Sequence, residues 1–548
     1  MNEAALAAFQ NFAARYQIDP RSYLRQEGES SPHYWLRRLG HVKPVELMWK
    51  ETEVAGLRRA LSASQLVYVG IGGIIGTGIF VLSGQAAALY AGPAITISYV
   101  IASIVAGLAA LSYSEMASMI PVAGSAYTYG YATLVRCMDY WLGFDLGVHV
   151  AVGWSGYFVQ FFQIAFNVKL SDSWTQPTVT WVEVPPTISH NPEHYFNVPG
   201  FVVVCLATAL LCLGIREAAW VNATIVVIKL IVITLFVLSV CSFVDAANYH
   251  PYVPPNTGDW HFFGVPGIFA GASTVFFSYI GFDAVSTAAQ EAKNPKKDVP
   301  FGIIGSLSIS TLLYIATCTV MTGAAPYHKL DVPTPVTVAI NEVEVRTMRD
   351  WRWLNIIVAL GAICGLTSVM IIFLLAQSRV FYSMGQDGLL PAWLARVHPR
   401  FRTPFRATLL VGSITAVLAA VMPIDLLSNM SSVGTLLAYL VVHAGVLVLR
   451  FTRPELERRF RIPGGKYFSL LVPICGVAIC ILIIAVSEVT TIWRLFVWMA
   501  IGWLVYFGYG IRHSKFHKDP LARFEEAKAW RRSIHLDELP QSSRDTRV

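Results

Sequence analysis

Charged residues are scarce in this chain. Asp, Glu, Lys and Arg make up 14% of its 548 residues, whereas about a quarter of an ordinary soluble domain is charged. Hydrophobic residues make up 55%, and the mean hydropathy is +0.53. Apolar windows of about 20 residues, each long enough to cross a bilayer, recur along most of the chain. The composition excludes a soluble globular protein and predicts an all-α integral membrane protein with several spans.

Motifs for several other chemistries are also missing. The eight cysteines form no CxxC pair and no Cys/His cluster at metal-ligand spacing, so we expect neither a metal site nor a disulfide framework. No HExxH sequence or pair of intramembrane aspartates indicates an enzyme, and no repeated filter segment indicates a channel. We therefore expect no catalytic residue and no cofactor. The net charge of +7 lies in tails and short loops, where membrane topology accounts for it without a nucleic-acid partner.

The chain divides into a polar start, a long apolar region and a charged end. Residues 1–64 lack the apolar core of a signal peptide, and we expect them in the cytoplasm. Part of this segment, SYLRQEGESSPHYWLRRLG, is either an amphipathic helix on the membrane surface or a solvated tail. Residues 512–548 are expected to be a cytoplasmic tail. Between them we predict about twelve spans, at 65–85, 92–118, 136–166, 199–215, 219–243, 262–290, 300–324, 353–384, 405–422, 427–449, 468–487 and 491–511.

Basic residues between the spans support this count. The loops EAKNPKKD, RVHPRFRTPFR and RFTRPELERRFRIPGGK fall on one side. The expected outer loop at 168–198 has a single lysine, Lys169, and the one at 325–352 mixes acids with its arginines. Since cytoplasmic loops are enriched in Lys and Arg, both termini are expected in the cytoplasm. Without a visible organellar address, we expect the plasma membrane; the oligomeric state is left open.

Two of the spans contain residues that weaken helices. The first holds VGIGGIIGTGIFVLSG, residues 69–84, with six glycines. Its glycines either allow close helix packing or mark a broken helix whose free backbone groups hold a ligand. The sixth span carries VFFSYIGFDAVS, with Gly281 in its middle. Interruptions five spans apart indicate an inverted-repeat transporter with broken helices. We predict a transport core at 65–449, made of repeats 65–243 and 262–449, and two additional helices at 468–511.

Five motifs carry a family resemblance. GIGGIIGTGIFVLSG, AGPA, SYSEMASMIPVAGSAYTYGYATL, FFSYIGFDAVSTAAQEAKNPKKDVPFGI and AQSRVFYSMGQDGLLP follow one another in this order. Together they resemble the cationic amino acid transporter (CAT) family of the amino acid–polyamine–organocation (APC) superfamily, in the twelve-span form of plant, algal or bacterial members. The resemblance implies a LeuT-like 5+5 inverted repeat and alternating-access transport of arginine, lysine or ornithine. One departure is Gln290 with Glu291, where members commonly have paired acids.

The first broken span supplies the carboxylate side of the expected substrate site. A free amino acid carries an α-carboxylate beside an α-ammonium. Where the span resumes after Gly76, Thr77 and Gly78, unpaired N–H groups and the positive end of a helix dipole favour a carboxylate. The resemblance implies Ile74, Thr77 and Gly78 as contacts on this side.

The sixth span supplies the second half of the expected site. Carbonyl groups at the ends of the first half-helices, near residues 71–73 and 277–279, can accept from the ammonium. The resemblance implies Phe277, Ser278 and Phe282 as further substrate contacts. The alternative for both phenylalanines is core packing or lipid contact.

Lys229 is an isolated ionisable residue in the fifth span, within NATIVVIKLIVITLFVL. An intramembrane charge is by default a functional candidate, although a lysine near a span end can reach the surface. The resemblance places Lys229 where sodium-coupled relatives of this fold hold a sodium ion between spans 1 and 8. A fixed ammonium can replace that cation, and a buried lysine can exchange a proton. We therefore expect proton-coupled or facilitated transport that does not need sodium.

Two acids complete the candidate residues. Glu115, in SYSEMAS near the end of the second span, matches an acid that the family carries, and we expect a gate or a structural partner for a backbone donor. Asp283 is a candidate counter-ion for a cationic substrate. It also stands at the start of the second half of the sixth span, where a helix-capping aspartate is favoured. We therefore predict gating or structural support for both.

The substrate class is less well determined than the fold. The eighth span, CGLTSVMIIFLLAQ, is expected to line the pocket for the substrate side chain. It is apolar from Met370 to Leu374 and offers no acid to a basic head group. The resemblance favours cationic amino acids, but these residues do not support it independently. A neutral or broad-range amino acid permease, a polyamine permease and an amino-acid-sensing receptor therefore stay open.

Overall fold

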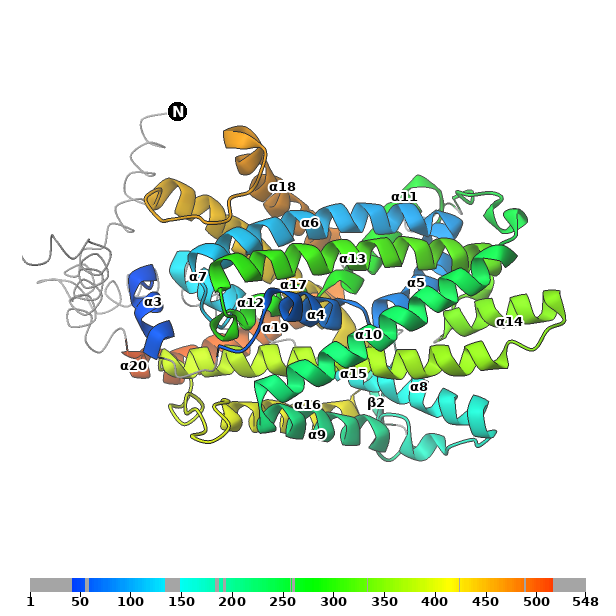
Figure 1. Ribbon diagram of the computed structural model, residues 1–548, viewed down its shortest axis with the longest axis horizontal. Helices are drawn as coiled ribbons and strands as arrows, with labels where there is room; N and C mark the ends of the chain where they lie inside the picture. Colours follow the sequence, from blue (N-terminus) through cyan, green and yellow to red (C-terminus); the bar gives the residue numbers. More distant parts are fainter. Residues whose placement is uncertain are drawn as a thin grey trace, which may run out of the picture.

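The computed structural model describes residues 42–54, 59–133, 148–182, 187–190, 194–256, 258, 262–332, 334–422, 424–486 and 489–515. The expected surface helix near the N-terminus and most of the C-terminal tail lie outside these residues. The long helices run roughly side by side along one direction, with shorter helices at both ends of the bundle (Figure 1).

Each of the twelve predicted ranges contains helix. The principal helices are α4 (Ala63–Ile74), α6 (Ile95–Met119), α8 (Val148–Phe166), α9 (Val198–Leu213), α10 (Ile215–Val240), α11 (Gly264–Phe276), α13 (Pro295–Ala324), α15 (Arg352–Gln386), α16 (Phe405–Val421), α17 (Ile424–Thr452), α18 (Gly465–Val486) and α19 (Val489–Val505). In the described part of the chain, eight helical segments are long and apolar enough to cross a membrane, and three shorter apolar helices accompany them. The helical, multi-span prediction is confirmed at this level.

The loops expected at the outer side contain structure that was not predicted. Strands β1 (Val179–Val182) and β2 (Thr187–His190) pair antiparallel in a short hairpin, which is an addition to the predicted all-α architecture. Helix α14 (Pro335–Thr347) occupies the second loop. Its buried residues include Val336, Ala339, Ile340 and Val343, a spacing that places them on one helix face. Asn341 and Glu342 interrupt this pattern in the sequence, so it forms no long apolar run.

The short helix α4 lies at the centre of the bundle, where it packs against α10, α13 and α15. Ser62 begins α4 with a capping box that includes Gln65, which satisfies backbone donors at the helix start. A Cβ on Gly70 would overlap the side chain of Ser306 on α13. The glycines of the first span therefore serve close packing in its first half.

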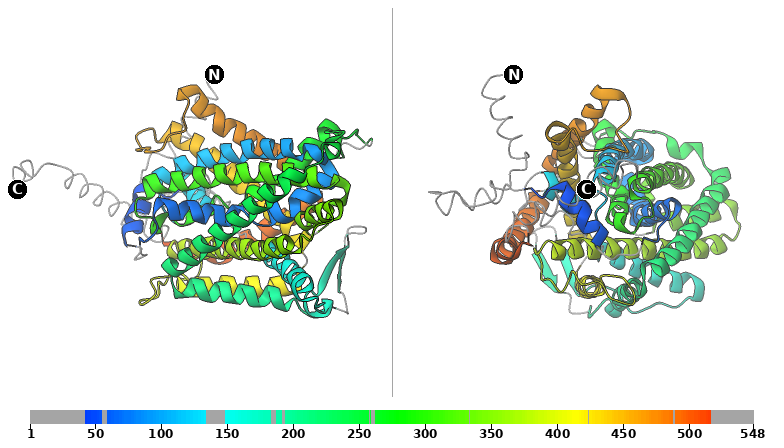
Figure 2. Two further views of the ribbon diagram at one scale, coloured as in Figure 1. Left: turned by 45° about the vertical axis from the view of Figure 1, so that its right-hand side comes forward. Right: turned by 60° about the vertical axis from the view of Figure 1, so that its left-hand side comes forward.

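Three further helices, α18, α19 and α3, lie away from this centre. Helix α18 lies at the edge of the bundle in both views of Figure 2 and packs against α17 and α6, and α19 also packs against α17. The short helix α3 (Val45–Val54) lies at one end of the bundle. That end also carries the last residues of α6, α15 and α17 and the first residues of α13. We call it the basic end, because Lys296, Arg450, Arg453 and Arg458 lie there.

Candidate functional site at two interrupted helices

The first interruption follows α4 directly. The helix ends at Ile74, and Ile75 has extended backbone angles (φ −78°, ψ 101°). Helical turns resume at Gly78 in the π-helical segment η2 (Gly78–Leu82). Thr77 stands before this segment, and its side chain makes no capping hydrogen bond. The chain is thus broken where the glycine-rich stretch predicted a break, and Gly76, Thr77 and Gly78 lie at that break.

The second interruption lies in the sixth predicted span. Helix α11 ends at Phe276 and is followed by the 3-10 turn η9 (Phe277–Tyr279). Gly281 then has φ +120°, a conformation that L side chains rarely adopt. Helix resumes in the single turn α12 (Ala284–Thr287). Phe277 and Ser278 therefore lie on the non-α-helical part of this segment.

The two interruptions touch each other through their backbones. A Cβ on Gly73 would lie 2.9 Å from the carbonyl oxygen of Gly281. A Cβ on Gly78 would lie 2.7 Å from Cα of Ser278. Side chains larger than hydrogen do not fit at such distances. The structure therefore brings Gly78 and Ser278, two of the predicted substrate contacts, together.

Two tyrosines that the sequence did not single out join the interruptions. The hydroxyl of Tyr314, on α13, is 2.8 Å from the carbonyl oxygens of both Ile74 and Ser278. The hydroxyl of Tyr99, on α6, donates to the carbonyl oxygen of Gly78 at 3.1 Å and lies 3.3 Å from Oγ of Ser278. Both tyrosines are fully buried. A tyrosine in an apolar span usually has a hydrogen-bond partner when buried, and this was the signal available in the sequence.

Lys229 projects from α10 to the carboxyl end of α4. Its Nζ donates to the carbonyl oxygens of Ile71 (3.1 Å), Gly72 (3.2 Å) and Ile75 (2.8 Å), and to Oγ of Ser368 on α15 (2.7 Å). Its side chain is fully buried, so it does not reach the surface. All four acceptors are uncharged, since three are backbone carbonyls and the fourth is a serine hydroxyl. The carboxyl end of a helix stabilises a cation through its dipole and free carbonyls.

This arrangement changes one expectation about substrate binding. The carbonyl groups near residues 71–73 were expected to accept from a substrate ammonium. Two of them, at Ile71 and Gly72, are already bound by Lys229, and the carbonyl of Ile74 is bound by Tyr314. The ammonium of Lys229 thus occupies the position at the end of α4 where a free cation would be held.

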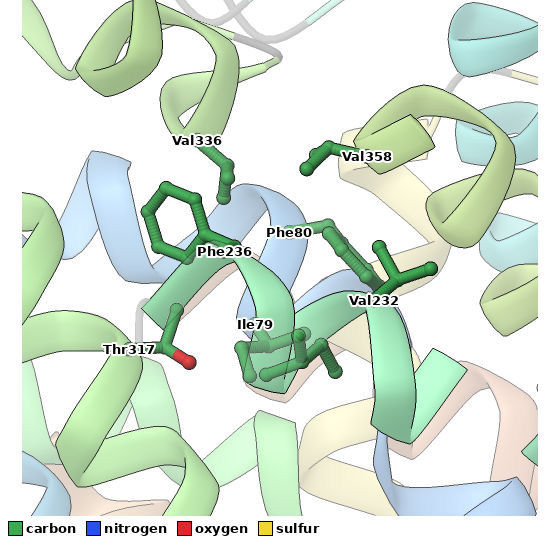
Figure 3. Close-up of a pocket in the computed structure, with 8 residues that line it drawn as sticks. Ile79, Phe80, Val232, Phe236, Thr317, Val336 and Val358 are labelled. Atoms are coloured by element: carbon green, nitrogen blue, oxygen red, sulfur yellow. The ribbon is translucent and has the colours of Figure 1, made fainter. Parts of the chain in front are cut away.

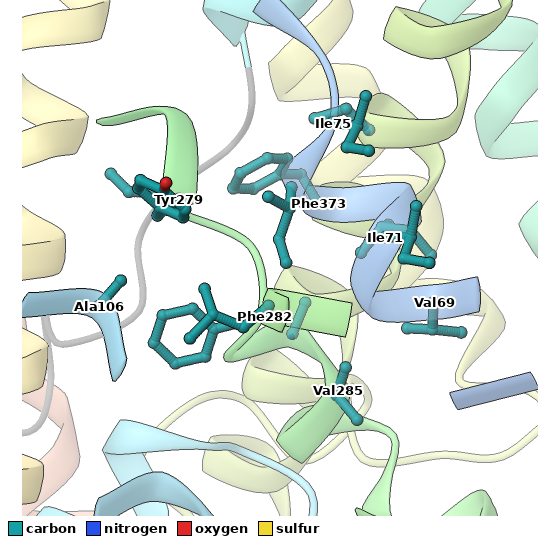
Figure 4. Packing of buried hydrophobic residues seen from close by; sticks show 14 of the residues in the cluster. Val69, Ile71, Ile75, Ala106, Tyr279, Phe282, Val285 and Phe373 are labelled. Carbon is teal, nitrogen blue, oxygen red and sulfur yellow. The ribbon is translucent and has the colours of Figure 1, made fainter. Parts of the chain in front are cut away.

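The two predicted phenylalanines have different surroundings. The ring of Phe277 is half-buried and lies 4.9 Å from that of His149 on α8, edge to face. The ring of Phe282 is fully buried against Tyr113 (5.7 Å) and Tyr439 (5.2 Å). Figure 4 shows Phe282 among buried hydrophobic residues beside the interruptions. Phe282 therefore packs in an aromatic cluster, which was the alternative considered for it.

Phe373 belongs to the apolar stretch of the eighth predicted span. Figure 4 shows it in the same buried cluster as Ile75, which directly follows α4. Its ring centre is 6.1 Å from that of His149. Side chains from α8, α15 and both interruptions therefore meet in this region, and most of them are apolar.

Asp283 does not cap α12. Its backbone is helical (φ −66°, ψ −25°), and its side chain makes no capping hydrogen bond. A capping side chain reaches back to the helix from an extended backbone, which explains the difference. Oδ1 of Asp283 instead accepts from the N–H of Gly281 at 3.2 Å. The predicted cap is wrong, and the residue supports the turn at Gly281.

Glu115 lies in a buried cluster near the basic end. Its Oε1 accepts from Nε of Arg450 at 2.9 Å, and its Oε2 accepts from Nη2 of the same residue. The N–H of Ile462 also donates to Oε2 at 3.1 Å, and Nε of Arg458 lies 3.5 Å from Oε1. The carboxylate is fully buried. It joins α6 to the end of α17 and to the chain that follows.

A small apolar cavity lies beyond the first interruption (Figure 3). Its lining is Ile79, Phe80, Val232, Ile233, Phe236, Thr317, Val336 and Val358. None of the predicted site residues lines it, and Thr317 is the only polar residue in the lining. This cavity does not suit the two charges of a free amino acid.

The chain is similar in sequence to known permeases and transporters. Residues 61–506 match the family model described as amino acid permease. The chain is 38% identical to the methylthioribose transporter of Bacillus subtilis over 87% of its length and 98% of that protein. It is 39% identical to the branched-chain amino acid permease BcaP of the same organism, over 84% of this chain and 95% of that protein. It is 34% identical to cationic amino acid transporter 4 of Homo sapiens, over 76% of this chain and 63% of that protein.

Proposed function

The chain belongs to the amino acid permease family, and on this premise we propose that it is a secondary transporter that moves amino acids across a membrane by alternating access. Its relatives are permeases and transporters, not enzymes. The observation that carries the proposal is the contact of two interrupted helices at Gly73 and Gly281, with Lys229 bound at the end of the first. Interrupted helices in corresponding positions of two halves are typical of such transporters.

We assign the substrate's charged groups to the two interruptions. The amides at Thr77 and Gly78 precede a helical stretch, which favours the α-carboxylate. The ammonium of Lys229 repels a second cation at the end of α4. We therefore assign the α-ammonium to the carbonyl groups of η9, near Phe277 and Ser278, each of which has a second lone pair beside the hydrogen bond it already accepts. Ile74 and Gly76 complete the wall of the first interruption. Substrate binding then bridges the same two segments that Tyr314 joins.

We assign ion coupling to Lys229. Its four oxygen partners come from α4, from Ile75 directly after it, and from α15. These segments correspond to spans 1 and 8 of the predicted repeat. A bound ammonium leaves no need for sodium at this position, and exchange of its proton would couple transport to a proton gradient. The twelve-span topology, cytoplasmic termini and plasma-membrane location belong to the same proposal, supported by the basic loops.

For the substrate class we propose neutral amino acids with apolar side chains first. Phe277, Phe373 and Ile75 provide an apolar surface beside the interruptions. The two bacterial relatives that match over nearly their whole length are named for a branched-chain amino acid and for methylthioribose. Cationic amino acids are the second candidate class, favoured by the five sequence motifs and by the human relative.

Uptake by the purified protein in liposomes tests this proposal. Radiolabelled leucine and arginine would be supplied separately, with and without an inward proton gradient, and with sodium or choline outside. We expect leucine to enter, the proton gradient to accelerate its entry, and sodium to have no effect. Entry of arginine in preference to leucine would replace the neutral class by the cationic one.

Two variants separate coupling from general damage. Lys229→Ala removes the buried ammonium, and we expect it to abolish stimulation by the proton gradient. Lys329→Ala is the matched control, since Lys329 forms an ion pair with Glu342 (2.7 Å) and is about half exposed. If neither amino acid enters while both raise the melting temperature of the protein, the chain is an amino-acid receptor and the transport proposal fails.

A further inference from the structure

Helix α3 precedes the first span and lies against the basic end of the bundle (Figure 1). Val45, Leu47 and Met48 of this helix are buried. Lys43, two residues before the helix start, is also buried, with 4% of its side chain exposed. A helix outside the spans whose first four residues, 45–48, are all buried is docked on the protein.

Polar contacts tie α3 to α15 and α17. Lys43 forms an ion pair with Asp387, directly after α15, and Asp387 also accepts from the hydroxyl of Tyr127 at 2.6 Å. Glu46 pairs with Arg453, directly after α17, at 2.6 Å. The exposed fractions of Asp387, Glu46 and Arg453 are 10%, 8% and 12%. Removing one partner of an ion pair this deeply covered costs more than removing one partner of a surface pair, because it leaves a buried charge uncompensated.

Other contacts tie α3 to α6 and α13, the helices on the side away from α15. Nε1 of Trp49 donates to the carbonyl oxygen of Met119, the last residue of α6, at 2.9 Å. Nζ of Lys296, in the first turn of α13, lies 5.7 Å from the centre of the Trp49 ring. Helix α6 packs against α13 and α17 and is joined to α17 by Glu115 and Arg450, whereas α15 packs most extensively against α8 and α10. Helix α3 therefore spans two groups of helices at one end of the bundle.

We propose that α3 is a strap that locks the basic end of the transporter closed and must detach in each transport cycle. The inference rests on the proposed alternating-access function, because two groups of helices must separate at one end to release substrate there. The strap contacts both groups, so they cannot separate while all four contacts persist. Loss of one ion pair lowers the stability of the closed end and raises the population of the open one.

A second ion pair lies deeper along α15 and identifies a position for a probe. Arg379 donates to Glu291 at 2.7 Å, with both side chains 1% exposed. Arg379 precedes Asp387 by eight residues, which is about 12 Å along a helix. Ser383 lies between the two pairs, and it is 6% exposed, with its Oγ 2.6 Å from the carbonyl oxygen of Ala123. A cysteine at this position would report opening beneath the strap.

The test measures the reactivity of Ser383→Cys in full-length protein whose native cysteines are replaced by serine or alanine. A membrane-impermeant maleimide would be applied to the purified protein. We expect Lys43→Ala to increase the labelling rate about tenfold, the change that corresponds to about 1.4 kcal/mol. Lys329→Ala, which breaks an exposed ion pair, is the control and should leave the rate unchanged. The charge exchange of Lys43→Asp with Asp387→Lys should restore slow labelling.

Equal labelling rates in Lys43→Ala and Lys329→Ala would overturn the strap. If Lys43→Ala does not fold, Glu46→Gln weakens the ion pair between Glu46 and Arg453 and gives the same comparison. Labelling does not require transport, so the two proposals fail separately. Faster labelling in Lys43→Ala together with no uptake by the unsubstituted protein would support the strap as a movable element and refute transport.

Discussion

Gly73 and Gly281 meet backbone to backbone where the two interrupted helices cross. A Cβ on Gly281 would lie 2.6 Å from the carbonyl carbon of Gly73, and a Cβ on Gly73 would lie 2.9 Å from the carbonyl oxygen of Gly281. This contact determines the separation of the segments on which the candidate site is built. Backbone atoms cannot move aside as a flexible side chain can, so the contact is sensitive to added volume.

Alanine at Gly281 should therefore be strongly destabilising. It introduces an overlap with Gly73 and strain at φ +120°, each of which costs about 1–3 kcal/mol. We expect loss of folded protein or a clear drop in the melting temperature, which would be measured by tryptophan fluorescence. Gly107→Ala is the control, since a Cβ there meets nothing within 4 Å in the middle of α6 and alanine favours helix by about 1 kcal/mol. Equal stability of the two variants would contradict the close backbone contact between Gly73 and Gly281.

Removing the hydroxyl of Tyr314 should weaken the link between the interruptions. Tyr314→Phe leaves the carbonyls of Ile74 and Ser278 without this donor, and an unsatisfied buried polar group costs about 1–3 kcal/mol. We expect a lower melting temperature and slower uptake. Tyr249→Phe removes one hydrogen bond, to the carbonyl oxygen of Thr319, at a half-buried site and should have a smaller effect. A Tyr314→Phe protein with unchanged uptake would show that the bridge has no part in transport.

Ser368 should tune the response of uptake to pH. It accepts from Lys229 at 2.7 Å, and a hydrogen bond to a charged group is worth about 1.5–3 kcal/mol. In Ser368→Ala the charged form of Lys229 loses an acceptor, so the midpoint of the pH profile of uptake should move to lower pH. Thr367→Val is the matched control, because Thr367 accepts from Trp154 instead. A shift of the same size in both variants would refute the assignment of ion coupling to Lys229.

Glu115 should prove necessary for folding rather than for the rate of transport. Glu115→Gln leaves Arg450 without its buried carboxylate partner, and breaking such a pair costs about 3–5 kcal/mol. We expect a much lower yield of folded protein, with normal uptake per folded molecule. The exposed pair of Glu457 and Arg459 provides the control, since Glu457→Gln should change stability by less than about 1 kcal/mol. Normal stability with slow uptake would instead identify Glu115 as a gate.

The sequence predicted the helical ranges because burial in lipid leaves a strong local signal. Long apolar windows, Lys229 inside one of them, and glycines in the first and sixth spans were all visible in the chain. The segments that were missed have weaker signals. Helix α14 is amphipathic over 13 residues, and the β1–β2 hairpin has strands of four residues, so neither produces a long apolar run.

The partners of polar groups were less predictable. Asp283 was expected to cap a helix because its residue type and position suit a cap, but its backbone conformation prevents this. Tyr99 and Tyr314 bind backbone carbonyls that became free only because the helices are interrupted. A residue's own neighbours in sequence carry no information about such acceptors.

The sequence by itself determined that this chain is a helical membrane protein with two weakened spans, because backbone periodicity and burial in lipid depend on local composition. Only the tertiary structure decided how the charges are paired. The partners are far apart in the chain: 154 residues separate Lys229 from Ile75, 335 separate Glu115 from Arg450, and 344 separate Lys43 from Asp387. Such pairings arise from the packing of whole helices, which brings together ends that are distant in the chain.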